Sequence, residues 1–209
     1  MSNRTTVDEW PKFWEIEKSH GNFSAYPFLT GTRIGNVARF HARYSFAADL
    51  NALNIKNATP STNRGYTSLL RLFSVWSALE SYFKLFCDDK HQLRSFYIAR
   101  YDTAKRHNLN LALRALSPAT DAFFKFIRDE DNTDSTHKNK INDFLNGNSY
   151  DPSYLLSGAR HVFGHGVLTP SSGGASTAQI EKISNLLKNF FLDVINCDFN
   201  SVVRAHPDY

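Results

Sequence analysis

Apolar side chains recur at intervals of three and four residues along much of the chain, the spacing that places them on one face of an α-helix. The pattern is strongest between about residues 62 and 86. The positions of that stripe are Leu69, Leu72, Trp76, Leu79, Phe83 and Phe86. A stripe of this length is typical of a helix that packs in a bundle, so the sequence predicts a long core helix here.

Two further segments carry the same spacing. Residues 34–53 predict a helix that is interrupted by KNATPST, in which we interpret Pro60 as the stop signal. The last helix is predicted to follow Ser176, which forms a capping-box pattern with Gln179, and to continue to about Asn196. Its inward positions are expected to be Ile180, Ile183, Leu187, Phe190, Phe191 and Val194.

Another helix has clear signals at both ends. Asp151 suits the N-cap and Pro152 the first helical position, and the glycines at 164 and 166 predict its C-terminal end. The preceding stretch, about 88–150, is interpreted as an insertion that contains short helical segments and a polar loop over 129–140.

The N-terminal residues 1–30 are rich in aromatic side chains and predict an arm packed on the domain, with a short helix near 8–18. Together these patterns indicate a single domain over 1–209. Its expected fold is all-α: an antiparallel helical bundle of four or five main helices with an inserted helical and loop segment.

Composition agrees with a packed domain, since 42% of the 209 residues are hydrophobic and 21% are charged. No apolar run is long enough for a transmembrane helix, and the N-terminal residues lack the apolar region of a signal peptide. Cys87 and Cys197 form no short-spaced motif and are expected to be small core residues. These features predict a cytoplasmic protein with no membrane partner.

The net charge is +4, and the basic residues are clustered. Asp102 is the only acidic residue between Lys90 and Arg114, a segment that holds Lys90, Arg94, Arg100, Lys105, Arg106 and Arg114 together with the aromatic residues Phe96, Tyr97 and Tyr101. A second cluster consists of Arg33, Arg39 and Arg43. Positive charge beside aromatic rings suits nucleic acid, but a solvated helix face would have the same pattern.

A carboxylate falls inside the apolar stripe of the 62–86 helix. At 100° per residue, Glu80 lies on the same face as Leu69 and Leu79. A charge in a core-facing stripe is costly unless it is paired. We therefore expect Glu80 to have a cationic partner, namely Arg160 or a histidine of the helix that follows Asp151.

That helix ends in the sequence ARHVFGHG, in which Arg160, His161 and His165 lie close together. One interpretation is an ordinary helix end, where basic side chains interact with the last carbonyl groups. A second is a metal site, because His161 and His165 are four residues apart and share a helix face. Further ligands and the glutamate of an H-E-x-x-H motif are not evident in the sequence.

A third interpretation is phosphate chemistry. Arginine presents a planar fork of donors to a phosphate and stays charged, while histidine can transfer protons near neutral pH. RNA cleavage by attack of the ribose 2′-OH needs these two functions and requires no metal in principle. In this interpretation Arg160 stabilises the phosphoryl charge and His165 moves the proton, with neither metal nor cofactor.

The segment from Arg160 to His165 resembles the R-x(4–6)-H motif of the HEPN superfamily (higher eukaryotes and prokaryotes nucleotide-binding domains). His161 and Gly166 fit the polar residue and the glycine that often accompany this motif, and Glu80 in WSALESYFKLF is similar to an acidic residue of an earlier helix. The resemblance covers roughly residues 62–86 and 141–196.

The resemblance implies an all-α domain that forms a homodimer through the motif helices and acts as an endoribonuclease, as a toxin or an antiviral-defence effector. Arg160 and His165 would be catalytic, with His161 and Glu80 in support, and RNA and a regulatory or antitoxin protein would be partners. The alternative is a non-catalytic module that binds a nucleotide, RNA or protein. One subgroup carries a modifiable tyrosine two residues after the histidine, where this chain has Val167, so silencing by that route is not expected.

Overall fold

The computed structural model describes residues 5–88, 98–131, 135–170 and 173–209. Within these ranges the chain forms eight α-helices, one short 3-10 helix and no strand. The elements are α1 (Trp10–Ser19), η1 (Phe23–Ala25), α2 (Ile34–Asp49), α3 (Pro60–Phe83), α5 (Thr103–Arg114), α6 (Ala119–Glu130), α7 (Ser135–Leu145), α8 (Pro152–Gly164) and α9 (Thr177–Arg204). The all-α fold predicted from the sequence is confirmed.

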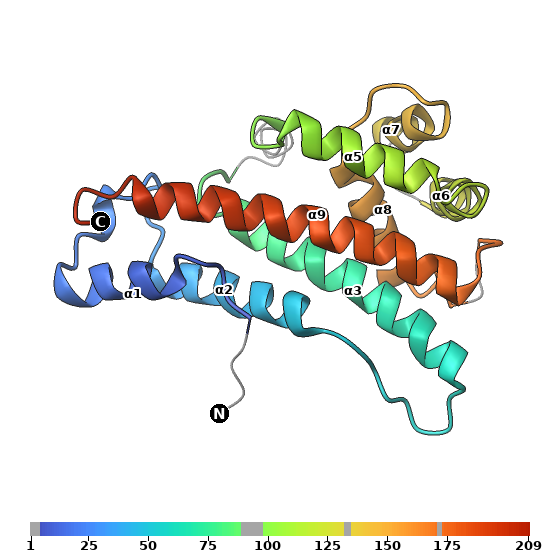
Figure 1. Ribbon diagram of the computed structural model, residues 1–209, viewed down its shortest axis with the longest axis horizontal. Helices are drawn as coiled ribbons and strands as arrows, with labels where there is room; N and C mark the ends of the chain where they lie inside the picture. The colour runs from blue at the N-terminus through green and yellow to red at the C-terminus, as the bar shows by residue number, and fades with distance from the viewer. Residues whose placement is uncertain (1–4, 89–97, 132–134, 171–172) are drawn as a thin grey trace.

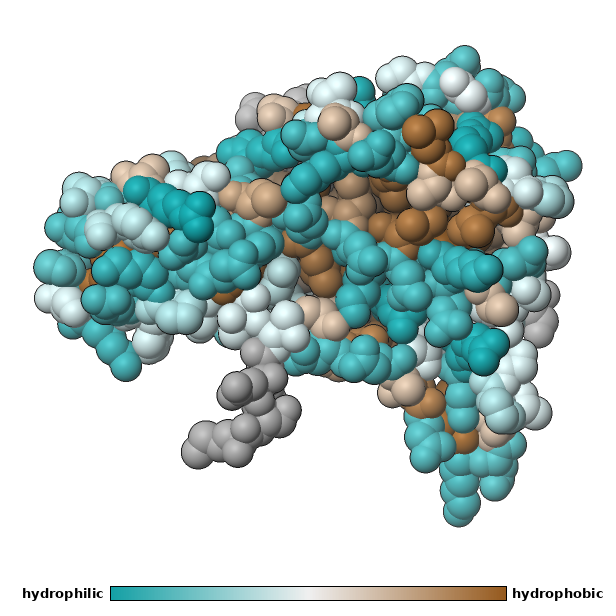
Figure 2. All heavy atoms as spheres, viewed as in Figure 1, coloured by the Kyte–Doolittle hydropathy of each residue, from teal (hydrophilic) through white to brown (hydrophobic). Residues whose placement is uncertain are grey.

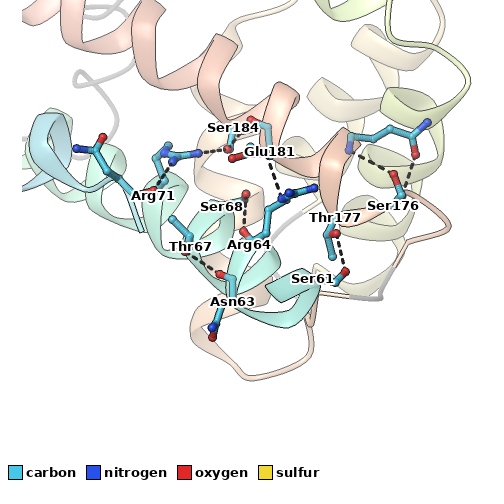
Figure 3. Close-up of polar contacts among 12 residues, drawn as sticks. Ser61, Asn63, Arg64, Thr67, Ser68, Arg71, Ser176, Thr177, Glu181 and Ser184 are labelled. Carbon is cyan, nitrogen blue, oxygen red and sulfur yellow. Dashed lines mark hydrogen bonds and ion pairs between the residues drawn. The ribbon is translucent and has the colours of Figure 1, made fainter. Parts of the chain in front are cut away.

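Helices α3 and α9 lie side by side along the length of the molecule and form its centre (Figure 1). Their polar contacts advance in step along both helices, from Ser61 with Thr177 (2.9 Å) to Arg64 with Glu181 (3.5 Å) and Arg71 with Ser184 (3.1 Å) (Figure 3). The two helices are therefore parallel, because the chain between them returns to the level where α3 begins.

Helix α2 packs antiparallel to α3. Arg71 in the middle of α3 donates to the carbonyl of Asn51, just after α2, whereas the Phe40 ring meets Tyr82 near the end of α3 at 4.8 Å. The predicted antiparallel packing is therefore found between α2 and α3, whereas the two central helices, α3 and α9, run parallel to each other.

The structure corrects several predicted helix boundaries. Helix α2 ends at Asp49 and does not continue to Leu53. Pro60 begins α3 and does not only end the preceding segment, because Thr59 caps the helix by accepting the Thr62 N–H at 3.1 Å. Proline is favoured in the first turn, where its missing N–H costs no hydrogen bond. Helix α9 starts with the predicted Ser176–Gln179 capping box but continues past Asn196, because Phe199 and Val203 extend its buried face.

The segment predicted as a polar loop over 129–140 is partly helical. Helix α7 begins at Ser135, and residues 132–134 lie outside the described residues. Its buried side chains are His137, Ile141 and Phe144, which share one face. The polar residues around His137 concealed this face from sequence inspection.

The aromatic arm packs on one end of the bundle, as predicted. Phe13 of α1 is fully buried, and its ring lies 5.3 Å from Tyr26 and 5.7 Å from Phe199 of α9. The cysteine prediction is half correct, since Cys87 is buried but Cys197 is exposed on α9.

Helices α5, α6 and α7 form a second group on the other side of α9, and α8 lies among them and α3 (Figure 1). Figure 2 shows that apolar surface gathers on this face where α5 and α6 run beside α9, while the remainder of the face is mainly polar. Among the described residues, no helix is long and apolar enough to span a membrane.

Candidate active site

Helix α8 carries the cluster of Arg160, His161 and His165, and its start is as predicted. The Asp151 carboxylate accepts the Ser153 N–H at 2.9 Å and its hydroxyl at 2.7 Å, and Pro152 occupies the first turn. Most of the helix is buried, including Leu155, Ala159 and Val162. Its last turn reaches the surface, so the buried part of α8 fixes where the cluster emerges.

The C-terminal end of α8 is closed by main-chain hydrogen bonds. The N–H of Val167 donates to the Val162 carbonyl at 3.2 Å, and the N–H of Gly166 donates to the Phe163 carbonyl at 2.9 Å. This pair of bonds is a Schellman motif, which needs a left-handed residue after the helix, and Gly166 has φ 76°. Glycine meets that requirement without strain.

These main-chain hydrogen bonds test the interpretation of the cluster as an ordinary helix end, in which basic side chains satisfy the last carbonyl groups. The carbonyl of His161 accepts the N–H of His165 at 3.1 Å, so the last-turn carbonyls at 161–163 all have main-chain partners. The side chains of Arg160, His161 and His165 are therefore not needed to cap the helix. They remain favourable to the helix dipole, but that interaction leaves their polar atoms available.

Arg160 lies against an aromatic ring at the surface. Its guanidinium carbon is 5.9 Å from the centroid of Phe73 on α3, a cation–π contact, and the Phe73 ring also meets Phe163 at 6.4 Å. No carboxylate of the described chain forms an ion pair with Arg160. A partly exposed guanidinium that contacts an aromatic ring and has no acidic partner can bind a phosphate by donating hydrogen bonds to its oxygens.

The two histidines of the cluster contact each other. Their rings meet edge to face with centroids 4.4 Å apart. His165 is exposed and occupies the C-cap position, where the Schellman motif fixes its backbone, while His161 is half-buried on the turn before it. His165 thus faces solvent, and His161 connects it to the interior.

Beneath His161 lies a buried polar network that sequence inspection did not find. Asp131, at the C-terminal end of α6, is fully buried, and its carboxylate lies 3.7 Å from Nε2 of His161. The same carboxylate contacts Nδ1 of the buried His137 on α7, and Nε2 of His137 is 2.7 Å from the Ser157 hydroxyl on α8. One carboxylate therefore joins α6, α7 and α8 below the cluster.

This network has little space around it. A Cβ added at Gly158 would lie 2.9 Å from Ile127 and 3.1 Å from Cε1 of His137. The glycine therefore lets α8 approach α6 and α7 closely enough for Ser157 to reach His137. Close packing of this kind holds the side chains of the network in fixed positions.

The position of His161 has an electrostatic consequence. Burial lowers the pKa of His161, the Asp131 carboxylate opposes that change, and the neighbouring charges of His165 and Arg160 reinforce it. His161 is thus favoured in its neutral form near pH 7, in which one ring nitrogen donates and the other accepts a hydrogen bond.

The predicted role of Glu80 is not found. Its carboxylate pairs with Lys84, one turn later on α3, at 3.1 Å, and the side chain is 36% exposed. Phe73 marks where α3 meets the end of α8, and Glu80 lies seven residues farther on, about 10 Å along the helix. The expectation of a cationic partner was correct, but the partner is Lys84, and the carboxylate near the cluster belongs to Asp131.

The basic segment over 90–114 is partly neutralised within the protein. Lys90, Arg94, Phe96 and Tyr97 lie outside the described residues. The other cations with acidic partners are Arg100 (with Asp198, 3.1 Å), Lys105 (with Asp193, at hydrogen-bonding distance) and Arg114 (with Asp121, 3.3 Å). These pairs join α5 to its neighbours and favour the interpretation of a helix surface over that of a ligand site.

The metal interpretation needs at least one more ligand beside His161 and His165. Over the ranges that the structure describes, no three histidine, cysteine, aspartate or glutamate side chains are grouped so that they could hold a metal ion. The nearest carboxylate, Asp131, is buried and already in contact with His137. The arrangement of these donors therefore suits proton transfer and hydrogen bonding better than coordination.

Comparisons of the chain with protein-family models, with curated protein sequences and with solved structures found no significant match. The resemblance to the HEPN superfamily therefore depends on the motif residues of the sequence, which lie at the end of α8.

Proposed function

We propose that the protein is a metal-independent endoribonuclease of the HEPN type, acting as a toxin or an antiviral-defence effector in the cytoplasm. The observation that supports this most directly is the end of α8, where main-chain bonds complete the helix and leave Arg160 and His165 at the surface. An arginine without an acidic partner beside exposed and half-buried histidines offers both functions that RNA cleavage needs.

In the proposed reaction the ribose 2′-OH attacks the adjacent phosphorus, and the bond from phosphorus to the 5′ oxygen breaks. Arg160 donates to the phosphoryl oxygens on which negative charge develops. His165 takes the proton from the 2′-OH or delivers one to the leaving oxygen. The products are a 2′,3′-cyclic phosphate and a 5′-hydroxyl. The proton lost by the 2′-OH is balanced by the proton that the leaving 5′ oxygen gains.

His161 and Asp131 have supporting roles in this proposal. The buried carboxylate holds His161 from below, and the His161 ring contacts that of His165. Fixing one ring limits the orientations of the other, and a positioned acid–base group is worth more than a freely rotating one. Asp131 therefore takes the positioning role that the sequence assigned to Glu80.

A homodimer through α8 would complete the site. A single proton-transfer histidine must act first as base and then as acid, whereas two copies related by a twofold axis bring a second Arg160 and a second His165 to one groove. We expect α8 of both copies near that axis. An inhibitory protein would be a further partner if the protein is a toxin.

The alternative is a binding module that uses the same surface without cleaving RNA. It would keep the charge of Arg160 and the exposed rings but would not depend on proton transfer by His165. The two functions differ in one measurable way, because only the enzyme loses its activity when His165 is replaced while RNA binding persists.

The test is cleavage of single-stranded RNA by the purified protein in excess EDTA, with product ends identified by mass spectrometry. We expect 2′,3′-cyclic phosphate ends and a loss of rate of roughly 10²–10⁴-fold in His165→Ala. The control variant is His107→Ala, which changes a histidine of α5. An unimpaired His165→Ala protein would contradict the proposal, and activity that EDTA removes and zinc restores would return the histidines to a metal site.

A further inference from the structure

A shallow apolar pocket lies between α2 and α3, next to the end of α8. Its volume is about 270 Å³, and its lining residues are Ala42, Arg43, Phe46, Leu70, Phe73, Ser74 and Ser77. Phe73 belongs to both places, because it lines the pocket and its ring is also contacted by Arg160 and Phe163 of α8. The pocket and the candidate active site are therefore adjacent.

Two phenylalanine rings that line the pocket are exposed to solvent. Phe46 is 54% exposed and Phe73 is 37% exposed, so both leave apolar area in contact with water. Phe46 stands at a surface position of α2, while its neighbours Tyr44, Ser45 and Ala47 are buried. Packing within the protein therefore gives no reason for a phenylalanine at this position.

The charge around the pocket is positive. Arg43 lines it and is exposed, Arg160 lies against the shared Phe73 ring, and the lining contains no acidic residue. Neither arginine is paired with a carboxylate in the part of the chain that the structure describes. A ligand that combines a flat apolar group with negative charge on both sides of it would match this surface.

We infer that the pocket between α2 and α3 binds an unpaired nucleobase of the RNA substrate, stacked on Phe46 and Phe73. The phosphates beside that base would lie on Arg43 and on Arg160. This inference rests on the proposed function, because it takes RNA as the substrate and places one nucleotide next to the one that reacts.

The size and chemistry of the pocket favour a base over other occupants. Sites for drug-sized ligands span about 300–1,000 Å³, so this pocket suits a smaller flat group. Bases stack on aromatic side chains whatever their sequence, and arginine adds both charge and a planar surface. A second copy that covered the pocket with its own α2–α3 face would bring two Arg43 side chains together, and the lining supplies no carboxylate to compensate them. The proposed dimer contact lies beside the pocket, at the end of α8, where the RNA phosphate would lie between the two Arg160 side chains.

The test measures binding separately from cleavage. A short fluorescein-labelled single-stranded RNA with 2′-O-methyl groups has no attacking 2′-OH, so its dissociation constant with the full-length protein can be measured by fluorescence anisotropy in EDTA. We expect Phe46→Ala to raise the dissociation constant by roughly 5- to 150-fold, the loss of one stacked base. Phe46→Trp should keep the affinity, because it keeps a stacking ring.

Matched controls separate stacking from charge and from folding. Leu111→Ala removes an apolar side chain of nearly equal exposure, 55%, on α5 and should leave binding unchanged. Arg43→Ala should reduce the dependence of binding on salt by about one phosphate contact, and Arg39→Ala, a change on the same helix outside the lining, should reduce it less. An RNA with abasic residues should bind the wild type weakly, and its dissociation constants for the wild type and for Phe46→Ala should be the same.

The outcomes distinguish this inference from the proposed function. Binding that depends on Phe46, combined with no cleavage of unmodified RNA, would support the pocket and remove the nuclease. Cleavage with a KM that Phe46→Ala does not change would keep the nuclease and overturn the pocket. A Phe46→Ala protein that becomes monomeric in sedimentation while its RNA affinity is unchanged would also overturn it, by assigning the pocket to a protein contact.

Discussion

Helix α5 and the end of α8 both place basic residues at the protein surface, but they use them differently. On α5, Lys105 pairs with Asp193 of α9. Arg100, which lies just before α5, donates a hydrogen bond to Asp198, also on α9. At the end of α8, Arg160 contacts the ring of Phe73 and has no carboxylate partner among the described residues. Lys105 and Arg114 of α5 thus have acidic partners within the protein, and Arg106 is the exception on that helix among the described residues, whereas Arg160 contacts a ring in place of a carboxylate.

The comparison teaches that the density of positive charge in a sequence does not locate a binding site. The segment from Lys90 to Arg114 has the higher density, yet its described cations mainly hold α5 in place. What matters is whether the fold supplies the counter-charge. Where it does not, the cation stays hydrated and its positive potential remains available to attract an anion.

The buried carboxylate beneath the α8 cluster offers the sharpest contrast with a surface charge. Asp131→Ala is expected to lower the free energy of unfolding by about 3–5 kcal/mol, because it leaves the buried His137 without its acidic partner. Glu80→Ala, which breaks an exposed pair with Lys84, should cost less than about 0.5 kcal/mol. Urea unfolding measures both, and equal losses would show that Asp131 does not anchor the cluster.

Removal of one cation from each region tests the comparison directly. Arg160→Ala should reduce the rate of RNA cleavage by roughly 10²–10³-fold, because a charged donor is lost where negative charge develops. Lys105→Ala should leave the rate within about twofold, since its partner is Asp193. Arg160→Lys should recover part of the rate, because it keeps the charge and loses the fork. Similar losses at both positions would mean that total charge, and not the site, determines activity.

The contacts between the α5 region and α9 can also be removed by replacing the aspartates of α9. Asp198→Ala removes the acceptor of the fully buried Tyr82 hydroxyl, at 2.7 Å, and the partner of Arg100, so we expect a loss of about 1–3 kcal/mol. Asp193→Ala should cost at most about 1 kcal/mol, because its pair with Lys105 is largely exposed. Thermal unfolding of both variants measures the difference, and a larger loss at Asp193 would reverse the assignment.

The smallest expected effect is the dependence of stability on pH through His161. Burial lowers the pKa of His161, so between that lowered pKa and the ordinary value of 6.5 the unfolded chain binds more protons than the folded one. Stability should therefore decrease as the pH falls through about 6.5. His161→Gln should show a smaller decrease in melting temperature than the wild type over that interval. An identical decrease would mean that other groups cause it.

Most of the helices could be predicted from the sequence, because their signals are local. The apolar stripe of α3, the Asp151–Pro152 start of α8 and the Ser176–Gln179 capping box each depend on residues within a few turns of one another. The end of α8 is equally local, since Gly166 alone supplies the left-handed residue.

The candidate site was only partly predictable. Arg160, His161 and His165 are close in sequence, so their proximity followed from the helix. Asp131 stands in a run of acidic residues with nothing to set it apart, and its contacts with His137 and His161 depend on how α6, α7 and α8 pack. Glu80 was predicted to face the cluster from its angular position on the helix. The angle gives the face of α3 but not the position along α3 at which α8 packs.

The way α8 ends has a consequence for how this protein can change over time. Because hydrogen bonds of the main chain, with Gly166 as their hinge, terminate the helix, its stability makes little demand on the side chains at 160, 161 and 165. We expect replacements at 160 and 165 to leave the helix end intact, whereas His161 also contacts the buried Asp131. Under the proposed function, a single replacement at position 165 would therefore convert a nuclease into a binding protein while the helical scaffold stays the same.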